Sequence, residues 1–475
     1  MTVPYLIGAF ILVSSLFLNR NKKLSYFLVA VFLIMQWIFT VYEYQHKNIE
    51  EFGYFVPNAI GLLLLITISI ISIPAFYHSF IYFTKHNDSD KSRSIYLAAM
   101  VLLIAALSLA YLSNHIGLMW VFVELTTFSA SALIYHRRNL RSLEGTWKYI
   151  FVCSISITFV FIGILFLSIA VQEVGHANLT YTALLSKATE LNTFWLRLAF
   201  IFIFTGYTAK LSLVPMFTAG IDAKDKAPSP AGALLSSVLL NIGFLGIFRF
   251  YEIIAQTSLL LWTNHIILIA SVSSIFIATV YMVKVKNIKR MFAYSSMEHM
   301  GIVMLGIVAG GVGYYAAILH LIFHSFVKAG LFFQMGQIYR IFGSKSIYDV
   351  GNYFKYNITG AMVVLLAFIS ATAMPPSGMF ISEFMVFRSL FESHYIIVLI
   401  FVLMLLTIII WAFGKNMFKL LFSPPVNFVE ENIEKIKPIE SLSQFILFGL
   451  VIYLGINPPQ EMIDLINEAV KNLPL

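Results

Sequence analysis

Several titratable residues, of types that bind and release protons, lie inside long apolar stretches of this chain. Lys210 lies in a largely apolar stretch that begins at Phe194. A lysine at mid-membrane depth costs about 2.5–3.5 kcal/mol on insertion scales, so its presence indicates a function. Glu124, Lys328 and Glu383 have similarly apolar surroundings. Together these groups indicate a protein that handles protons or other ions.

Glu124 and Lys210 are predicted to form a buried pair of opposite charge. Glu124 lies near the centre of its apolar stretch, too far from either end for its carboxylate to reach water. A buried carboxylate is protonated unless a cation lies close by, and Lys210 is the candidate cation. If the pair can separate, the lysine can switch between holding and releasing a proton. The alternative is a static ion pair that fixes helix packing.

His320, His324 and Lys328 are spaced four and eight residues apart, which places them on one face of a helix. Imidazoles titrate near neutral pH, so this row predicts a proton path, with packing histidines as the alternative. Two histidines at this spacing could instead bind a metal ion. The motif supplies no third ligand and the lysine would repel the ion, so we expect no metal here.

Glu383 and a few other polar residues have predicted roles of their own. Glu383 is expected to be the last proton carrier before an aqueous exit, with an interfacial carboxylate as the alternative. Glu298 and His299 are expected about two turns into their helix, as an intake or a plain cap, and count as accessory candidates. Arg249 lies near a predicted helix end and is expected to extend to the membrane interface.

The composition identifies the elements that must hold these residues. The chain has 475 residues, of which 59% are hydrophobic and 11% charged, whereas a soluble protein has about 25% charged residues. We therefore predict an all-α integral membrane protein. The single Cys153 excludes a disulfide framework and a cysteine-based metal centre. No cluster of Lys and Arg is interleaved with aromatic residues, so the sequence does not indicate nucleic-acid binding. No nucleotide-binding motif is present either, and no cofactor is expected on this chain.

A membrane span needs about 20 apolar residues, and the hydrophobic pattern predicts about fourteen spans. Their approximate positions are Val3–Asn19, Leu24–Tyr42, Asn58–Phe83, Ser94–Ser113, His115–Tyr135, Trp147–Val171, Phe194–Ile221, Pro228–Tyr251, Ser258–Val283, Met291–Gly310, Gly313–Tyr339, Asn357–Glu392, Tyr395–Phe422 and Ser441–Ile456.

The basic residues predict the orientation. With both termini outside, the inner loops hold 23 of the 31 Lys and Arg residues. The outer loops hold only Lys47, Lys187 and Lys471. Basic residues collect in cytoplasmic loops, so this asymmetry supports both the number of spans and a multi-pass location in the cytoplasmic (inner) membrane.

Two predicted spans, the seventh and the twelfth, contain proline beside an ionisable residue. Pro215 follows Lys210, and Pro375 and Pro376 precede Glu383. Proline breaks a helix, and membranes tolerate the break only where protein or water satisfies the freed groups. Broken spans five helices apart predict two inverted repeats, with ordinary kinks as the alternative. We therefore predict four parts. Residues 1–93 form three helices, residues 94–251 and 252–422 form one repeat each, and residues 423–475 contain the last helix.

Five ordered motifs resemble the antiporter-like membrane subunits shared by respiratory complex I and Mrp-type sodium/proton antiporters. They are Trp120–Glu124, Gly206–Lys210, Ala227–Leu235, Lys289–Ser296 and the His320, His324, Lys328 row. Within that group, the segments Ser295–Gly301 and Pro375–Glu383, with Asn241, are most similar to the hydrogenase-4 component F type, which belongs to membrane-bound [NiFe] hydrogenases and formate hydrogenlyase.

The resemblance implies fourteen helices, two inverted repeats and a chain of charged residues along the membrane midplane. It implies that Glu124 and Lys210 are the charged pair of the first half, Lys328 the central lysine of the second half and Glu383 the terminal carrier. Many relatives carry Lys or His on the eighth helix, where this chain offers only Ser236 and Asn241 as accessory candidates. Asn cannot carry a proton, so a link between the halves would need water.

We therefore predict a proton-translocating membrane subunit of a multi-subunit redox complex, either hydrogenase-4/formate hydrogenlyase-type or NADH-quinone oxidoreductase-like. Its expected partners are other membrane subunits and, through them, a redox arm such as a [NiFe] hydrogenase with iron–sulfur subunits. Redox catalysis is not expected on this chain itself. The alternatives are an Mrp-type antiporter subunit that moves Na⁺ as well as H⁺, and a non-conducting membrane scaffold.

Overall fold

The computed structural model describes residues 1–85, 88–175, 178–426, 428 and 433–474. Throughout these residues the regular secondary structure is helical, which confirms the predicted all-α membrane fold. Twelve of the described helices are long and apolar enough to cross a membrane, and Thr2–Leu18 and Ile358–Ala371 are shorter apolar helices. The number of crossings, the inverted repeats and the four predicted parts remain predictions.

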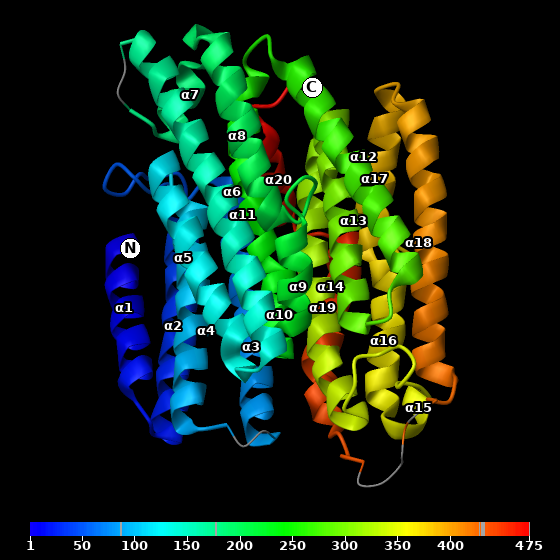
Figure 1. The fold of residues 1–475 in the computed structure, drawn as a ribbon. Helices are drawn as coiled ribbons and strands as arrows, with labels where there is room; N and C mark the ends of the chain where they lie inside the picture. Colours follow the sequence, from blue (N-terminus) through cyan, green and yellow to red (C-terminus); the bar gives the residue numbers. More distant parts are fainter. Residues whose placement is uncertain (86–87, 176–177, 427, 429–432, 475) are drawn as a thin grey trace. The chain divides into compact units, whose positions relative to one another are not determined.

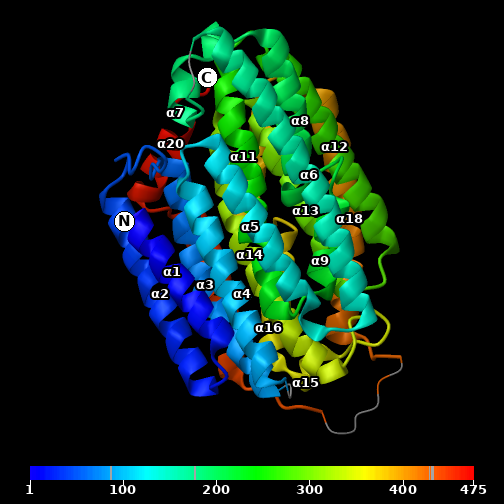
Figure 2. The same cartoon turned by 60° about the vertical axis from the view of Figure 1, so that its left-hand side comes forward.

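The chain forms two compact units. The first comprises Met1–Ala231, Val238–Ile266 and Asp464–Leu475 (blue to green in Figure 1, with a red terminal segment). Its α6 and α8 run side by side, as Figures 1 and 2 show. The helices of this unit are α1 Thr2–Leu18, α2 Lys22–Gln45, α3 Ala59–Lys85, α4 Asp90–Leu112, α5 Ile116–Ile134, α6 Leu140–Glu173, α7 Tyr181–Ser186, α8 Thr193–Leu211, α9 Thr218–Lys226 and α11 Val238–Ala255.

The second unit comprises Gly232–Ser237 and Ile267–Ile463. Its α13 and α14 pack along each other, and α17 packs against both. The helices of this unit are α13 Ile288–Ala309, α14 Val312–Phe342, α15 Tyr353–Tyr356, α16 Ile358–Ala371, α17 Gly378–Glu392, α18 Ile396–Phe422 and α19 Leu442–Ile456. Three helices have residues in both units: α10 Ser229–Ser236, α12 Leu260–Lys284 and α20 Gln460–Val470.

The chain leaves the helical conformation beside both proline motifs. Helix α8 ends at Leu211, where Ser212 adopts a left-handed φ of 62°, and α9 begins only at Thr218. Helix α16 ends at Ala371, and α17 begins at Gly378 with the Ser377 side chain capping its first turn. Because proline has no N–H and its ring clashes with the preceding turn, neither helix can continue through these segments.

One predicted helix is interrupted at a position without a proline. The expected span Pro228–Tyr251 is divided into α10 and α11, with Ser237 as a turn between them. The Ser237 hydroxyl donates to the Ala233 carbonyl at 2.7 Å, so a side chain takes part in the hydrogen bonding of the last turn of α10.

A glycine sets the distance between α11 and the end of α8. A Cβ atom at Gly243 would lie 2.5 Å from the Leu211 backbone nitrogen, closer than any real contact allows. Gly243 therefore lets the backbone of α11 reach the helix end that carries Lys210. We expect this close contact to fix the position of the lysine.

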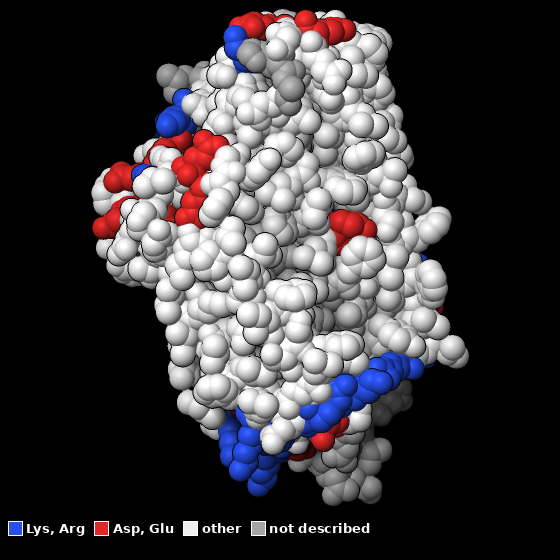
Figure 3. All heavy atoms as spheres, turned by 90° about the vertical axis from the view of Figure 1, so that its left-hand side faces the viewer, with Lys and Arg blue, Asp and Glu red and all other residues white. Residues whose placement is uncertain are grey.

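Charged residues are unevenly distributed over the surface. On the face drawn in Figure 3, Lys and Arg gather at the lower end and Asp and Glu lie mainly toward the upper end. The broad zone between them is almost uncharged apart from one acidic patch. An apolar zone of this kind is what a membrane-spanning protein presents to lipid.

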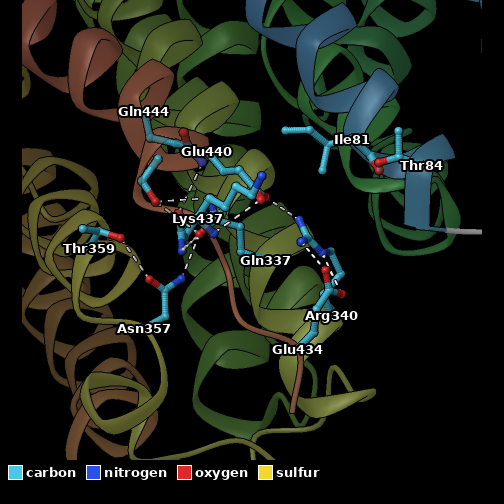
Figure 4. A network of polar contacts seen from close by, with 12 residues as sticks. Ile81, Thr84, Gln337, Arg340, Asn357, Thr359, Glu434, Lys437, Glu440 and Gln444 are labelled. Carbon is cyan, nitrogen blue, oxygen red and sulfur yellow. Dashed lines mark hydrogen bonds and ion pairs between the residues drawn. The ribbon is translucent and has the colours of Figure 1, made fainter. Parts of the chain in front are cut away.

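A polar network ties the segment before α19 to α14 (Figure 4). Arg340 donates to Glu434 at 3.2 Å and forms an ion pair with Glu440. One turn earlier on α14, Gln337 accepts from Asn357 at 3.0 Å. These buried and half-buried polar groups therefore have hydrogen-bond partners at the end of a long apolar helix.

Candidate functional site

Lys210 is the penultimate residue of α8 and is only 4% exposed. Its ammonium Nζ lies 2.8 Å from Thr127 Oγ1, 3.3 Å from Thr126 Oγ1 and 3.3 Å from the Tyr149 hydroxyl. An ammonium group has three N–H donors, so these three oxygens can satisfy it completely. The Nζ atom also lies 5.4 Å from the centre of the Tyr149 ring, which adds a favourable cation–π contact.

Glu124 and Lys210 are linked through Thr127. Glu124 lies on α5 and is half-buried, and its Oε2 accepts a long hydrogen bond of 3.4 Å from Thr127 Oγ1. Among the described residues Lys210 forms no ion pair within 4.0 Å, although it interacts electrostatically with Glu124. The sequence indicated the two charges but not this hydroxyl. Glu124 and Thr127 are three residues apart, which places them on one face of a helix, and this spacing could have suggested the hydroxyl as the link. We call Glu124, Thr126, Thr127, Tyr149 and Lys210 the Lys210 cluster.

A second cluster lies in the other unit, where two imidazole rings are joined directly. His320 Nε2 lies 3.2 Å from His299 Nδ1. The far nitrogen of each ring also has a partner: His299 Nε2 lies 3.1 Å from the Ala371 carbonyl oxygen, and His320 Nδ1 lies 2.9 Å from Ser382 Oγ. Four helices, α13, α14, α16 and α17, contribute one residue each.

The Ala371 carbonyl fixes the direction of this row when both rings are neutral. A carbonyl oxygen only accepts, so His299 Nε2 must carry a hydrogen and His299 Nδ1 must accept. His320 Nε2–H is then the donor to His299, and His320 Nδ1 must accept. The Ser382 hydroxyl therefore donates to His320 Nδ1 and not to the Met379 carbonyl oxygen, which lies 3.0 Å away. The row therefore runs Ser382 to His320 to His299 to Ala371, with each group donating to the next.

Lys328 and two carboxylates complete the arrangement. Lys328 is fully buried on α14, and its Nζ donates to Ser295 Oγ at 2.7 Å. Glu298 interacts electrostatically with both Lys328 and Glu383, and its Oε1 lies 3.6 Å from His299 Nδ1. We call the group Ser295, Glu298, His299, His320, Lys328, Ser382 and Glu383 the histidine cluster.

The histidine cluster corrects the predicted depth of two residues. Glu298 and His299 were expected about two turns into their helix, as an intake or a plain cap, but they lie midway along α13 and are 2% and 1% exposed. His324 is also fully buried, and its ring centre lies 5.5 Å from that of His299. The sequence missed Ser295 and Ser382, because a serine in a helix gives no signal until its neighbours are known.

One subset of the histidine cluster has the residue types of a metal site. A ring nitrogen from each of His299 and His320 and a carboxylate oxygen of Glu383 lie within 4.8 Å of one another. Two histidines and a glutamate can hold zinc. These are not the two histidines that the helical spacing singled out, since His324 is not in this group. Lys328 interacts electrostatically with both rings and would oppose a bound cation, so the absence of a metal remains our prediction.

The remaining candidates occupy different settings. Ser236, the last residue of α10, is buried, and its hydroxyl has no hydrogen-bond partner among the described residues. Asn241 is buried on α11. Pro215, Pro375 and Pro376 lie in the two segments that interrupt the helices.

The expectation for Arg249 was wrong. It is 3% exposed and donates to the backbone carbonyls of Tyr111 at 2.7 Å and of Ser113. These carbonyls lie at the end of α4, where backbone carbonyls have no N–H partner within the helix. Arg249 therefore satisfies a helix end inside the protein instead of extending to the interface.

Comparison with known proteins identifies the family. Residues 113–409 match the family described as NADH:quinone oxidoreductase/Mrp antiporter, TM. A hydrogenase-4 component F homolog from Methylacidiphilum infernorum is 30% identical over 382 residues, 79% of each chain. The NADH-quinone oxidoreductase subunit N of Coxiella burnetii is 26% identical over 466 residues, 94% of this chain and 93% of that one.

Solved structures show the same fold. A chain of the Mrp complex from Dietzia sp. matches with a TM-score of 0.86 at 15% identity, covering 99% of this chain and 96% of that one. A chain of the membrane-bound sulfane sulfur reductase, an archaeal respiratory membrane complex, matches with a TM-score of 0.85 at 18% identity, with the same coverage. With the family match extending over more than half its length, this chain belongs to the NADH:quinone oxidoreductase/Mrp antiporter family of transmembrane proteins.

Proposed function

We propose that this chain moves protons across a membrane as a subunit of a multi-subunit redox complex. The observation that carries the proposal is the directed row Ser382–His320–His299–Ala371, buried beside Lys328 and Glu383. A membrane protein rarely buries ionisable groups unless they serve a pathway, because each of them is costly to remove from water. The Ser382 hydroxyl and the Ala371 carbonyl orient the two imidazoles, and the rings themselves are the groups that can take up a proton and pass it on.

The histidine cluster would pass a proton from Lys328 to Glu383. A proton held as ammonium at Lys328 is stabilised by Ser295 and by the Glu298 charge. When the lysine releases it, the imidazole pair can hold it, because either ring gains a second N–H on protonation. The Glu383 carboxylate lies within 4.8 Å of ring nitrogens of both histidines, a separation that a bridging water can span.

The Lys210 cluster would couple this movement to events in neighbouring subunits. Lys210 is held by hydroxyl oxygens and by an indirect contact with Glu124 through Thr127. A change of charge near the half-buried Glu124 would strengthen or weaken its attraction for the lysine. The lysine would then bind or release a proton in response. We propose that electron transfer in a partner arm supplies this change of charge.

The relatives support a redox complex as the setting. The 30% identical relative is named a hydrogenase-4 component F homolog, and others are named subunits of NADH-quinone oxidoreductase. We propose that the partners are membrane subunits of such a complex and, through them, a redox arm such as a [NiFe] hydrogenase with iron–sulfur subunits. The excess of Lys and Arg in alternate loops of the sequence supports placing both termini outside the cytoplasmic membrane.

Proton flux tests the proposal directly. The complex would be reconstituted in vesicles that contain a pH-sensitive dye, with wild-type chain or with Lys328→Ala. We expect the variant to lose most of the proton flux, because Lys328 supplies the ammonium group of the histidine cluster. Equal flux in the two preparations would instead indicate a non-conducting scaffold.

The second candidate is an Mrp-type antiporter subunit. The matching family includes Mrp antiporters, which favours this function as the next alternative. Such a subunit would work from ion gradients without electron transfer. Proton flux driven by a sodium gradient in vesicles that contain no electron donor would favour the antiporter over the redox-coupled pump.

A further inference from the structure

A basic cavity lies at one end of the second unit, away from the histidine cluster. It has a volume of about 500 Å³ and is bounded by the ends of α12 and α18 and by the loop that contains Ile347 and Tyr348. Four lysines line it: Lys284, Lys286, Lys415 and Lys419. None of the described residues that line it is acidic, so its charge complements an anion.

Two aromatic side chains hold lysines at the cavity wall. Lys415 Nζ lies 5.3 Å from the centre of the Trp411 ring, and Lys419 Nζ lies 4.7 Å from that of Tyr348. Both rings are exposed. Tryptophan and tyrosine are enriched where membranes meet water, because one part of the ring system is apolar and the other can be hydrated. Their presence supports a position of this cavity at headgroup level.

Apolar stripes lead from the cavity along both helices. On α12 the exposed residues Phe276, Val280 and Val283 recur at intervals of four and three, which is one helical face. On α18 the exposed residues Met404, Ile408 and Trp411 repeat the same spacing. Val283 and Trp411 themselves line the cavity, so each stripe ends at the lysines.

We propose that this cavity binds the headgroup of an anionic phospholipid. The lysines would contact its phosphates, and the two apolar stripes would contact its acyl chains. Basic pockets between membrane helices are known to suit such headgroups. Four lysines without a lining carboxylate favour a lipid with two phosphates over one with a single phosphate. A free phosphate ion would use the lysines but would leave the stripes without a partner.

The wall of the cavity is held by backbone hydrogen bonds. Ile347 N donates to Lys286 O at 3.0 Å, and Ile288 N donates to Lys345 O at 3.0 Å. The neighbouring carboxylate of Asp349 accepts from Ser344 at 2.8 Å and does not line the cavity. The loop therefore presents Tyr348 from a defined position, as a preorganised site requires.

Photolabelling of the whole complex tests the proposal. The complex would be placed in phosphatidylcholine vesicles with a trace of photoreactive cardiolipin, and label would be mapped to the ends of α12 and α18. Unlabelled cardiolipin should compete better than phosphatidylglycerol, and inorganic phosphate should not compete. Each Lys→Gln change should weaken binding about fivefold, so Lys415→Gln with Lys419→Gln should weaken it about 25-fold.

The control is a pair of lysines outside the cavity. Lys355 Nζ lies 5.4 Å from the centre of the Tyr356 ring, a similar contact to that of Lys415, and Lys435 is exposed. Lys355→Gln with Lys435→Gln changes the net charge equally and should leave labelling intact. Lys415→Arg with Lys419→Arg should retain labelling, which separates lost charge from misfolding. Equal loss in both glutamine pairs, competition by inorganic phosphate, or label replaced by a cross-link to a partner subunit would each overturn the proposal.

Discussion

His320 Nε2 lies 3.2 Å from His299 Nδ1, which joins the central rings of α14 and α13. The ring centres are 5.2 Å apart. Because the far nitrogens contact Ser382 and Ala371, neither ring can turn over without breaking a buried hydrogen bond. The two rings are therefore held in fixed orientations, and we propose that they connect the buried lysine of α14 with the carboxylate of α17.

Replacing His299 with glutamine should stop proton transfer. Glutamine can still donate to the Ala371 carbonyl, but an amide does not take up a proton near neutral pH. We expect the proton flux of His299→Gln to fall about a hundredfold, the scale of a lost proton-transfer group. His265→Gln, at an exposed position of α12, is the control and should leave the flux unchanged. Wild-type flux in His299→Gln would contradict the directed row.

Thr127→Val should disconnect Lys210 from Glu124. Valine keeps the branched shape but removes the hydroxyl that lies 2.8 Å from Lys210 Nζ and 3.4 Å from Glu124 Oε2. Loss of a hydrogen bond to a charged group costs about 1.5–3 kcal/mol, so protons pumped per electron should fall while electron transfer continues. The control is Ser129→Ala on the same helix, whose hydroxyl donates to Leu125 O. Equal coupling in both variants would show that Thr127 is not the link.

Individual site residues were predictable because the membrane makes them conspicuous. Lys210, Lys328 and His320 each interrupt an apolar helix, and one sequence suffices to see that. Their partners were not predictable, since Ser382 and Ala371 belong to other helices and are unremarkable in the sequence. His299 was identified as a candidate but placed too near a helix end, because α13 begins at Ile288, earlier than its apolar pattern.

For the fold, too, strong patterns in the sequence predicted the structure and weak patterns did not. Long apolar runs predicted the all-α membrane architecture, and the prolines indicated where α8 and α16 would end. The turn at Ser237 was missed because it contains neither proline nor glycine. The amphipathic α20 was not predicted, because its polar face removes the long apolar run that indicates a membrane span.

Arg249→Met should destabilise the first unit. The substitution keeps much of the apolar volume but leaves the carbonyls of Tyr111 and Ser113 without their donor. Such a loss costs about 3 kcal/mol, and the thermal midpoint of the purified protein should fall. Arg388→Gln is the control, because Arg388 is exposed and pairs with Glu392 on its own helix. That change should cost less than about 1 kcal/mol.

Docking of α20 should weaken in acid. Burial alone would raise the pKa of Glu468, but hydrogen bonds from Lys47 at 2.6 Å and Asn48 at 2.8 Å outweigh it and hold the pKa below its ordinary value. The stabilisation is complete above the ordinary carboxyl pKa of about 4.3 and is lost as the pH falls through the lower folded value. Hydrogen exchange of α20 should therefore rise in that window. Glu468→Gln should remove this pH dependence, and the control Glu461→Gln should keep it. Hydrogen exchange of α20 that does not change with pH in the wild type would refute the contact.

The most direct test of the account is the number of protons pumped per electron in the reconstituted complex with Lys210→Ala. Lys210 is the buried ammonium of the first unit, and its removal leaves Glu124 without the cation with which it interacts. We predict that pumping is abolished while electron transfer in the redox arm stays close to the wild-type rate. Full pumping in Lys210→Ala would contradict the claim that this lysine carries protons.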